Sequence, residues 1–419
     1  MKQRTWSLVI LILVLVISGC SSSPTADPFS SNKKITLTLW YWNRSIDDQL
    51  LQKAKEQFPN IHLVTQKIGG DFKSKLKTTM AAKSGEPDIV ALNDWIMELF
   101  PSQDRFYDLY EFGAAEVEDQ YLDWKWQQGV TPDGQMIGFP MDTGPTALFY
   151  REDLFEEAGL PTDPEEVHKQ MSTWDDYRKT GLTLKEAFNG KVFMYDNIEN
   201  VYNEIISQSD KKYFTPEGDF IGDSNEVIRE AWDMSLSFHQ DGLIANADHW
   251  TSEWNAGVNK GTIASFVGAV WMKQPLQEAA PDTAGKWRVT RAPGGDGNVG
   301  GSFMAIPKSS EHPKEAFEVI KWLQNPENQL TMLGTTNLFP STPSAFDSAT
   351  IREGEPFFGG QATGEVFAES ARNVKISFFG ERYPAVHGVM TRWLNNITSL
   401  NPDTAFDEAM QRVERELKR

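Results

Sequence analysis

The sequence predicts an α/β protein built as two lobes, and three observations support this fold class. Strand-like and helix-like segments alternate between residues 35 and 92. A kinked apolar segment from Gly138 to Tyr150 has the features of a chain that crosses between two rigid parts. The length of 419 residues is sufficient for two or more domains.

The alternating region favours a parallel sheet covered by helices on both faces. Its expected elements are strand 35–40, helix 47–58, strand 61–68, helix 71–84 ending at Gly85, and the fully apolar strand 88–92. In open α/β sheets the ligand crevice lies beyond the carboxyl ends of the strands. Trp42 and Asn43 follow the first strand, and Asp94 and Trp95 follow the third, so these four residues are the first candidates for a binding site.

The segment from Gly138 to Tyr150 is expected to form a hinge. The strand pattern of this segment is interrupted between Asp142 and Pro145. It then continues as an apolar strand that leads into a helix. Pro145 fixes its own backbone angle and restricts Gly144, whereas Gly144 permits angles closed to other residues. A polar kink between two rigid pieces is also a suitable place for a ligand-binding group such as Asp142.

The remaining chain is expected to be mainly helical up to residue 238 and mixed after it. The expected elements are helices beginning at Trp174, Leu182 and Glu226, strand 261–268, a helix opening at Val270, strand 287–290, the glycine-rich stretch 293–301, strand 302–306, and helices 313–323, 326–333 (ending at Gly334) and 404–417. No internal repeat with a fixed period is present.

The charge and the aromatic content narrow the function. The net charge is -19, which argues against binding to nucleic acid or to an anionic membrane. The chain has 14 Trp residues, a number that suggests aromatic contacts to a ligand, with packing in a large core as the alternative for each ring.

The N-terminus predicts export and anchoring. A basic start precedes an apolar run over residues 8–17, which is too short for a stable transmembrane helix and typical of a signal peptide. The run leads to Cys20, the only cysteine, in a pattern that resembles the bacterial lipobox, whose cysteine is lipidated. We therefore expect a signal peptide over residues 1–19, a lipidated Cys20, and a flexible tether over residues 20–34.

Several enzyme motifs are present only in part. Asp142-Thr143-Gly144 matches the tripeptide of aspartic proteases, but the second such tripeptide that the chemistry requires is absent. The spacing of Gly295, Gly297 and Gly300 fits a dinucleotide fingerprint, but a strand and not a helix is expected after it. The six His residues form no close pair, so no metal site is expected. We expect no catalytic residues and no cofactor.

The combined pattern resembles family 1 extracellular solute-binding proteins, the sugar-capturing subunits of bacterial ABC importers, which are related to maltose-binding proteins. The resemblance covers essentially the whole mature chain in order. It rests on the lipobox, the Trp-rich first strand, Pro87–Val90, Gly138–Pro140, Tyr150–Phe155, Lys260–Ala264 with Trp271, and Trp287 through Gly300 to Pro307.

The resemblance implies a two-lobe, type II periplasmic-binding-protein-like fold, in which each lobe is a sheet flanked by helices and several chain crossings form the hinge. The first lobe would comprise residues 35–142 and 292–338, and the second lobe residues 143–291 and 339–419. The glycine-rich stretch before Ser302 and residues 337–340 would form the other crossings. This agrees with the hinge inferred from Asp142 to Pro145.

Sugar chemistry selects the site residues, because aromatic faces cover the C–H faces of a sugar ring while carboxylates and amides bind its hydroxyl groups. The resemblance implies that Asp94 binds hydroxyl groups and that Trp271 stacks on a ring. The family's second charged residue has no match at Trp95. Positions beside the crossings, in a late loop or in the polar segment 248–255 add a weaker set: Asp142, Gly301, Ser302, Tyr383, Trp250 and Trp254.

We therefore expect a monomeric, lipid-anchored receptor on the extracellular face of the cell membrane that passes a sugar or oligosaccharide to ABC permease subunits. One alternative is a secreted glycoside hydrolase, because Trp residues and paired acids also serve that chemistry. Another is a binding lipoprotein that feeds a sensor kinase. The sequence leaves the identity of the sugar open.

Overall fold

The computed structural model describes residues 34–418 of the chain. The expected signal peptide, the expected lipidation site Cys20 and the expected tether up to residue 33 lie outside the described residues. The part from Ile35 onward forms one compact unit, and the description that follows concerns this unit alone.

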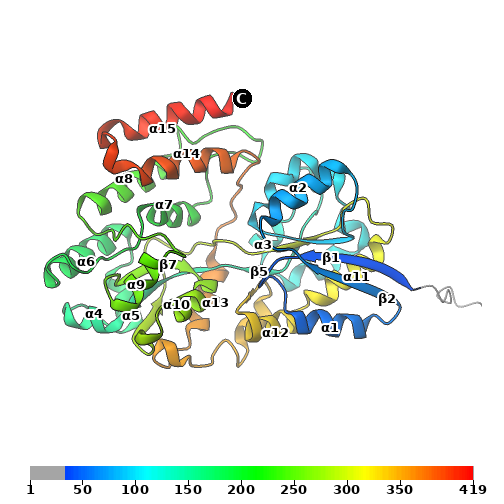
Figure 1. Cartoon of the computed structure of the whole chain (residues 1–419), viewed down its shortest axis with the longest axis horizontal. Coiled ribbons are helices and arrows are strands. Elements are labelled where there is room, and N and C mark those ends of the chain that lie inside the picture. The colour runs from blue at the N-terminus through cyan, green and yellow to red at the C-terminus, as the bar shows by residue number, and fades with distance from the viewer. Residues whose placement is uncertain (1–33, 419) are drawn as a thin grey trace, which may run out of the picture. The chain divides into compact units, whose positions relative to one another are not determined.

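The first lobe is built on a five-stranded sheet with the strand order β2-β1-β3-β9-β4. Its strands β1 and β2 and its helices α1 and α2 are labelled in Figure 1. The parallel pairing expected for the first three strands is confirmed, whereas β9 runs antiparallel to both of its neighbours. The strands are β1 (Ile35–Tyr41), β2 (Ile61–Lys67), β3 (Ile89–Leu92), β4 (Phe139–Pro140) and β9 (Phe303–Ala305). The helices of this lobe are α1 (Asp48–Gln57), α2 (Phe72–Ala82), α3 (Asp123–Gln127), α11 (Pro313–Leu323) and α12 (Pro326–Thr336), and the 3-10 segment η1 spans Asp94–Arg105.

Alternate residues of these strands face two separate hydrophobic clusters. Leu37 and Leu39 of β1 pack in a cluster with residues of α1 and α11, whereas Trp40 packs with residues of α2 and η1 on the opposite face. This alternation is the two-residue period of a strand that is covered on both faces. Helix α1 begins where Asp47 accepts hydrogen bonds from the backbone N–H groups of residues 49 and 50, which satisfies two of the free donors at its N-terminus.

The second lobe is built on a three-stranded antiparallel sheet in the order β7-β6-β8. All six residues of the central strand β6 (Thr146–Arg151) are buried, because helices pack on both faces of the sheet. Its neighbours are β7 (Ser265–Ala269) and β8 (Trp287–Thr290). The helices are α4 (Glu152–Glu157), α5 (Pro164–Gln170), α6 (Trp174–Ala187), α7 (Ile198–Ser207), α8 (Glu226–Gln240), α9 (Ser252–Lys260), α10 (Lys273–Ala279), α13 (Thr363–Asn373), α14 (Tyr383–Asn395) and α15 (Pro402–Leu417).

Several expected element boundaries at glycines are wrong. The helix expected to begin at Leu182 is the second half of α6, because Gly181 continues the helix and lets it approach Met194 and Leu243 closely. Gly334 lies inside α12, which ends at Thr336, and α2 ends at Ala82, before Gly85. The left-handed residues at these two ends are Asn337 and Lys83. The strand expected from residue 261 begins at Ser265, since Gly261 terminates α9.

Three chain segments lie side by side where the lobes meet. Strand β5 (Asp142–Thr143) pairs antiparallel with β10 (Phe339–Pro340), and Pro145 forms a bridge with Asn298. Gly144 is required here by close packing and not by an unusual backbone angle: a Cβ atom at this position would lie 2.0 Å from the carbonyl oxygen of Val299. The expected hinge at Asp142–Pro145 therefore coincides with a contact among three segments that are far apart in the sequence.

Candidate functional site

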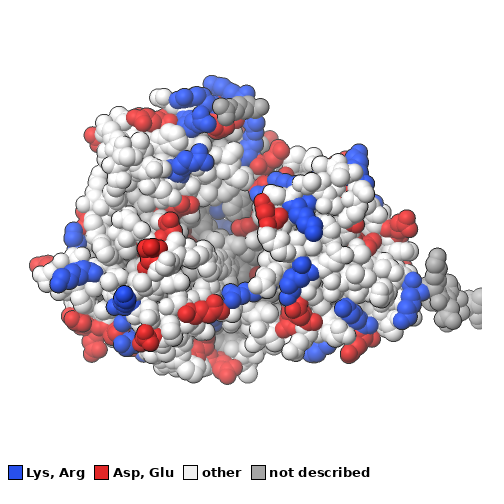
Figure 2. Space-filling model, in the orientation of Figure 1, with Lys and Arg blue, Asp and Glu red and all other residues white. Residues whose placement is uncertain are grey.

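A cavity of about 430 Å³ opens between the two lobes beside these three segments. Figure 2 shows a hollow in the middle of the molecule, with acidic and basic side chains mixed over the surrounding surface. We call this space the first cavity. It brings together eight of the eleven predicted ligand-binding residues from distant parts of the chain: Trp42, Asn43, Asp94, Asp142, Trp250, Trp271, Gly301 and Ser302.

The polar wall of the first cavity is formed by the carboxyl groups of Asp94 and Asp142. Asp142 is 5 % exposed, and its Oδ1 accepts a hydrogen bond of 2.9 Å from the backbone N–H of Ser302. Asp94 begins η1, with one residue between it and the end of the buried strand β3, and keeps part of its surface accessible. Burial raises the pKa of both carboxyl groups, while nearby lysine charges act in the opposite direction.

Lys125 is a buried basic residue beside the candidate site that sequence reasoning missed. Its side chain is fully buried, its amine lies 3.5 Å from the centroid of the Phe303 ring, and Nζ has no hydrogen-bond partner. Burial lowers the pKa of Lys125 to about 7, against the attraction of the Asp142 and Asp94 carboxyl groups. A Cβ atom on Gly301, which lines the cavity, would approach this amine to 2.9 Å, so the amine lies directly behind the cavity wall. The available signal was a lysine between two tryptophans in a short helix, Trp124 to Trp126.

The aromatic wall is formed by Trp250 and Trp271 of the second lobe. The two indole rings are parallel to within 10°, with centroids 6.1 Å apart. Trp271 donates a hydrogen bond of 3.0 Å from Nε1 to the carbonyl oxygen of Val299, which orients its ring. Trp250 is 63 % exposed and has a φ of 72°. On the other side of the cavity, Trp42 packs edge-on against Phe72, with centroids 5.2 Å apart.

The rim of the cavity carries an ion pair between the lobes. Arg44 Nη2 lies 3.0 Å from Glu278 Oε1, and both side chains are about half exposed. Arg44 follows β1, whereas Glu278 belongs to α10. An exposed ion pair of this kind contributes about 0–1 kcal/mol to stability. It therefore adds little to the stability of the contact between the lobes.

The prediction that Trp254 lines the ligand site is wrong. Its indole is 1 % exposed and packs against His249 and Phe266 in the core of the second lobe. Its Nε1 donates a hydrogen bond of 3.1 Å to Asp196. Trp254 is on the buried face of α9, and sequence reasoning could not assign it because Trp250 and Trp254 both stand in the same polar segment.

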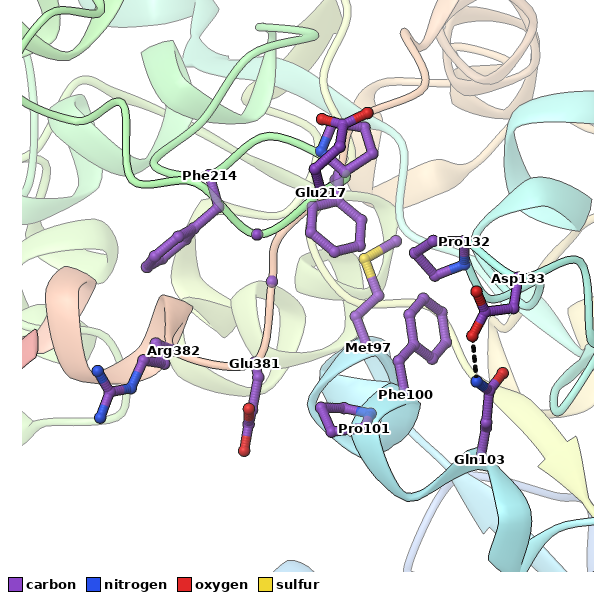
Figure 3. A pocket seen from close by; sticks show the side chains of 14 residues that line it. Met97, Phe100, Pro101, Gln103, Pro132, Asp133, Phe214, Glu217, Glu381 and Arg382 are labelled. Atoms are coloured by element: carbon purple, nitrogen blue, oxygen red, sulfur yellow. Dashed lines mark hydrogen bonds between the residues drawn. The ribbon is translucent and has the colours of Figure 1, made fainter.

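Trp95 and Tyr383 lie in a neighbouring cavity of about 450 Å³, which we call the second cavity. Asp94 lines both cavities. A third pocket of about 320 Å³ lies farther along, where Met97 and Phe100 of η1 are opposite Phe214 and Glu217 (Figure 3). A hydrogen bond of 2.6 Å between Gln103 and Asp133 stabilises its first-lobe side. The second cavity and this outer pocket share Met97 and Gly380.

Lys212 is a second basic residue that the sequence did not reveal. It is 2 % exposed, and its amine lies 4.2 Å from the centroid of the Phe379 ring. Burial lowers the pKa of Lys212 to about 8, although the charges of Asp94 and Glu204 favour the protonated form. Lys125 and Lys212 thus approach Asp94 from separate elements, which no local sequence pattern connects. Within residues 34–418, no group of three His, Cys, Asp or Glu side chains is arranged to hold a metal ion.

Two sheet-based lobes joined by several crossings, with a lined cavity between them, define the class of two-lobed solute-binding proteins. The model of the family described as bacterial extracellular solute-binding protein matches residues 43–330, and the chain belongs to this family. The expected family and fold class are therefore confirmed. In the described residues, no helix has the length and apolar character needed to cross a membrane.

Similar proteins support the same assignment. The chain is 25% identical over 410 residues to a lactose-binding protein of Rhizobium radiobacter, covering 90% of this chain and 91% of that protein. It is 24% identical over 347 residues to an arabinooligosaccharide-binding protein of Bacillus subtilis (strain 168), covering 78% and 77%. A crystal structure of an extracellular solute-binding protein of family 1 superimposes with a TM-score of 0.87 at 29% identity, covering 91% of this chain and 99% of that one.

Proposed function

We propose that this protein binds a sugar or an oligosaccharide in the first cavity and delivers it to an ABC importer. The observation that carries the proposal is that the parallel rings of Trp250 and Trp271 share one cavity with the carboxyl groups of Asp94 and Asp142. Aromatic faces match the C–H faces of a sugar, and carboxyl groups accept hydrogen bonds from its hydroxyl groups. The similarity to the lactose-binding and arabinooligosaccharide-binding proteins supports the same ligand class.

The proposed ligand-binding residues divide between the lobes. The first lobe supplies polar groups from Asn43, Asp94 and Asp142. It also supplies the aromatic edge of Trp42. In the second lobe, Trp250 and Trp271 supply aromatic faces. Gly301 and Ser302 lie in the crossing between them, and Lys125 positions Asp142 by charge from behind the wall. Trp95 and Tyr383 line the second cavity.

We place the lobe boundaries at residues 142, 292 and 338, where the three neighbouring segments cross. Since these segments are short, a rotation about them would open and close the cavity, and a ligand that binds both walls would favour the closed form. Ligand capture by lobe closure is the mechanism that this arrangement supports.

The proposal includes a lipid anchor on Cys20 at the extracellular face of the membrane, which follows from the basic start, the short apolar run and the single cysteine. It also includes ABC permease subunits as partners, as is usual for the family. The protein is proposed to act without catalysis, since the cavity offers groups that hold a sugar and the related proteins are binding proteins.

A thermal-shift screen of the mature protein tests the proposed ligand class. A ligand that binds only the folded state raises the free energy of unfolding, by about 2.7 kcal/mol at a concentration 100-fold above Kd. The melting temperature rises as a result. The screen would compare lactose, arabino-oligosaccharides, galacto-oligosaccharides and malto-oligosaccharides with amino acids and short peptides. A shift with saccharides alone is expected, whereas a shift only with peptides or amino acids would refute the proposal.

The same samples distinguish capture from hydrolysis. A glycoside hydrolase would release reducing ends from the saccharide that stabilises it, and a receptor would not. Binding with no increase in reducing ends after prolonged incubation is expected. If the wild type released reducing ends and Asp94→Asn did not, the protein would instead be a hydrolase.

A further inference from the structure

Trp250 depends on its neighbours in the chain for its position. Its indole is 63 % exposed, and its φ of 72° is a left-handed conformation that a bulky residue keeps only where the surrounding structure imposes it. The turn over residues 248–251 is closed by Thr251, whose backbone N–H and Oγ1 donate to the carbonyl oxygen of Asp248 at 3.2 and 2.7 Å. These bonds shape the turn, but they do not fix where it lies relative to Trp271.

The turn is tied to the start of α7 by the two residues that precede Trp250. The Asn197 side chain, whose oxygen caps α7, donates a hydrogen bond to the carboxyl group of Asp248. The imidazole Nε2 of His249 lies 2.6 Å from Oδ2 of Asp196. Because Asp196 and Asn197 are both buried, these two bonds connect the turn to a rigid part of the second lobe.

The carboxyl group of Asp196 is fully buried, and each of its oxygens accepts two hydrogen bonds. The backbone N–H of Asn197 and the side-chain amide of Asn200 donate to Oδ1. His249 and the indole N–H of Trp254 donate to Oδ2. A buried carboxylate is stable where it is paired and hydrogen-bonded in this way. Asp196 therefore joins the start of α7, the turn that carries Trp250, and helix α9.

The surroundings of His249 favour its protonated form. Burial acts to lower its pKa, but the carboxyl groups of Asp196, Glu204 and Asp248 outweigh burial and raise the pKa above its ordinary value. The ring also packs edge-on against Trp254, with centroids 5.2 Å apart, which restricts its rotation. A protonated imidazole forms a charge-assisted hydrogen bond to Asp196, and such a bond is stronger than one between neutral groups.

We propose that the hydrogen-bonded pair of His249 and Asp196 positions Trp250 and thereby sets the affinity of the first cavity for its ligand. Neither member of the pair lines the first cavity or the second cavity, so His249 is a positioning residue and not a contact residue. Without the pair, the turn is free to carry the indole away from Trp271. This inference rests on the proposed function, because it concerns the affinity of the same site.

His249→Ala tests the pair directly. The change leaves Asp196 with three hydrogen-bond donors, so the variant should fold. The probe is whichever of lactose and the arabino-, galacto- and malto-oligosaccharides gives the largest thermal shift with the wild type. Its affinity should fall about 5-fold, which is less than the loss expected for Trp250→Gly, since the ring is displaced and not removed.

A double-mutant cycle shows whether His249 acts through Trp250. In the Trp250→Gly background, His249→Ala should cause no further loss of affinity, because the residue through which it acts is already absent. Calorimetry with the same saccharide would measure the wild type, the two single variants and the double variant. A change that merely weakened the fold would lower the affinity in both backgrounds.

Two further variants separate the hydrogen bond from other effects of the substitution. His249→Gln retains an amide N–H that can donate to Asp196, so this variant should recover most of the affinity that His249→Ala loses. His239→Ala is the matched control, because His239 is a partly buried histidine near the end of α8 in the same lobe. This control should bind the saccharide like the wild type.

Amide hydrogen exchange of the ligand-free protein measures the position of the turn without a saccharide. Residues 248–251 should exchange at least about 5-fold faster in His249→Ala than in the wild type, and His249→Gln should exchange at nearly the wild-type rate.

An equal loss of affinity with and without Trp250 would overturn the inference, as would equal losses in His249→Ala and His249→Gln or unchanged exchange of residues 248–251. Each of these results leaves the proposed function intact, because the saccharide would still bind to the wild type. If no saccharide of the thermal-shift screen binds to the wild type, the proposed function fails and the inference about affinity fails with it.

Discussion

Trp250 and Trp271 face the first cavity with nearly parallel indole rings, although 20 residues and helix α9 separate them in the chain. The two residues are held in different ways. Trp271 is fixed by its hydrogen bond to Val299, whereas Trp250 is exposed and adopts a left-handed backbone conformation. Such a conformation costs a bulky residue on the order of 1–3 kcal/mol. This difference leads to separate predictions for the two residues.

Trp271→Ala should weaken saccharide binding by roughly 2–4 kcal/mol, because the truncation removes the apolar face that covers a sugar ring. Calorimetry with the saccharide found in the screen would measure the loss, and circular dichroism would check the fold. Binding equal to that of the wild type would exclude Trp271 as the stacking residue. Unfolding of the variant would show that its main role is packing.

Trp250→Gly should reduce the affinity for an oligosaccharide about 10-fold and leave folding stability within about 1 kcal/mol of the wild type. Glycine relieves the left-handed strain, which offsets the stacking energy of about 0.5–1.5 kcal/mol that is lost. Chemical denaturation and calorimetry provide the two measurements. Full affinity in this variant would show that the ring does not contact the ligand.

The buried carboxyl group of Glu204 is expected to make the free energy of unfolding depend on pH. It is 5 % exposed in α7, and burial raises its pKa to about 7. Between pH 4.5 and 7 the folded state therefore binds more protons at this site than the unfolded state, so the free energy of unfolding should fall as the pH rises. Glu204→Gln should remove this decline and be more stable than the wild type at pH 8 by roughly 2–3 kcal/mol.

Urea denaturation of both proteins at pH 5, 6, 7 and 8 would test the Glu204 prediction. Glu186→Gln is a suitable control, since this exposed glutamate lies on another helix of the same lobe. Parallel stability curves for the wild type and Glu204→Gln across this range would contradict the prediction.

Lobe closure predicts a change of shape in solution. If residues 142–145, 296–301 and 338–340 form the hinge, saturating saccharide should shift the population toward the closed form and reduce the radius of gyration. Small-angle X-ray scattering with and without ligand would measure this change. An unchanged radius with a ligand that calorimetry shows to bind would argue against closure.

Cys20→Ala should abolish lipid anchoring. The variant is expected in the culture medium or as an uncleaved precursor, because the tether offers no other apolar segment to hold the protein on the membrane. Fractionation followed by a carbonate wash would show its location, with Ser21→Ala as the control. Membrane association after the wash of a Cys20→Ala variant whose signal peptide has been cleaved would exclude Cys20 as the anchor.

Local sequence patterns predicted the bounds of some elements to the residue. The boundaries of β8 and α11 agree fully with the expected ones, and α11 combines a proline in its first turn with a regular apolar face. Boundaries at Gly181 and Gly334 were wrong, because a glycine inside a helix has no distinct local signal. The packing of Gly181 against Met194 and Leu243 keeps α6 continuous, and this contact is made between distant segments.

The sequence by itself determined the α/β class and the positions after β1 and β3 that face the cavity between the lobes, because these depend on short-range periodicity and on chain direction in a sheet. Only the tertiary structure decided which aromatic and charged residues reach the cavity. Trp250 and Trp254 are four residues apart, yet one is exposed beside Trp271 and the other is buried against Phe266. Lys125 and Lys212 approach Asp94 from different elements. The burial and the charge of these residues depend on distances between segments that only folding brings together. The order of residues along the chain does not contain those distances.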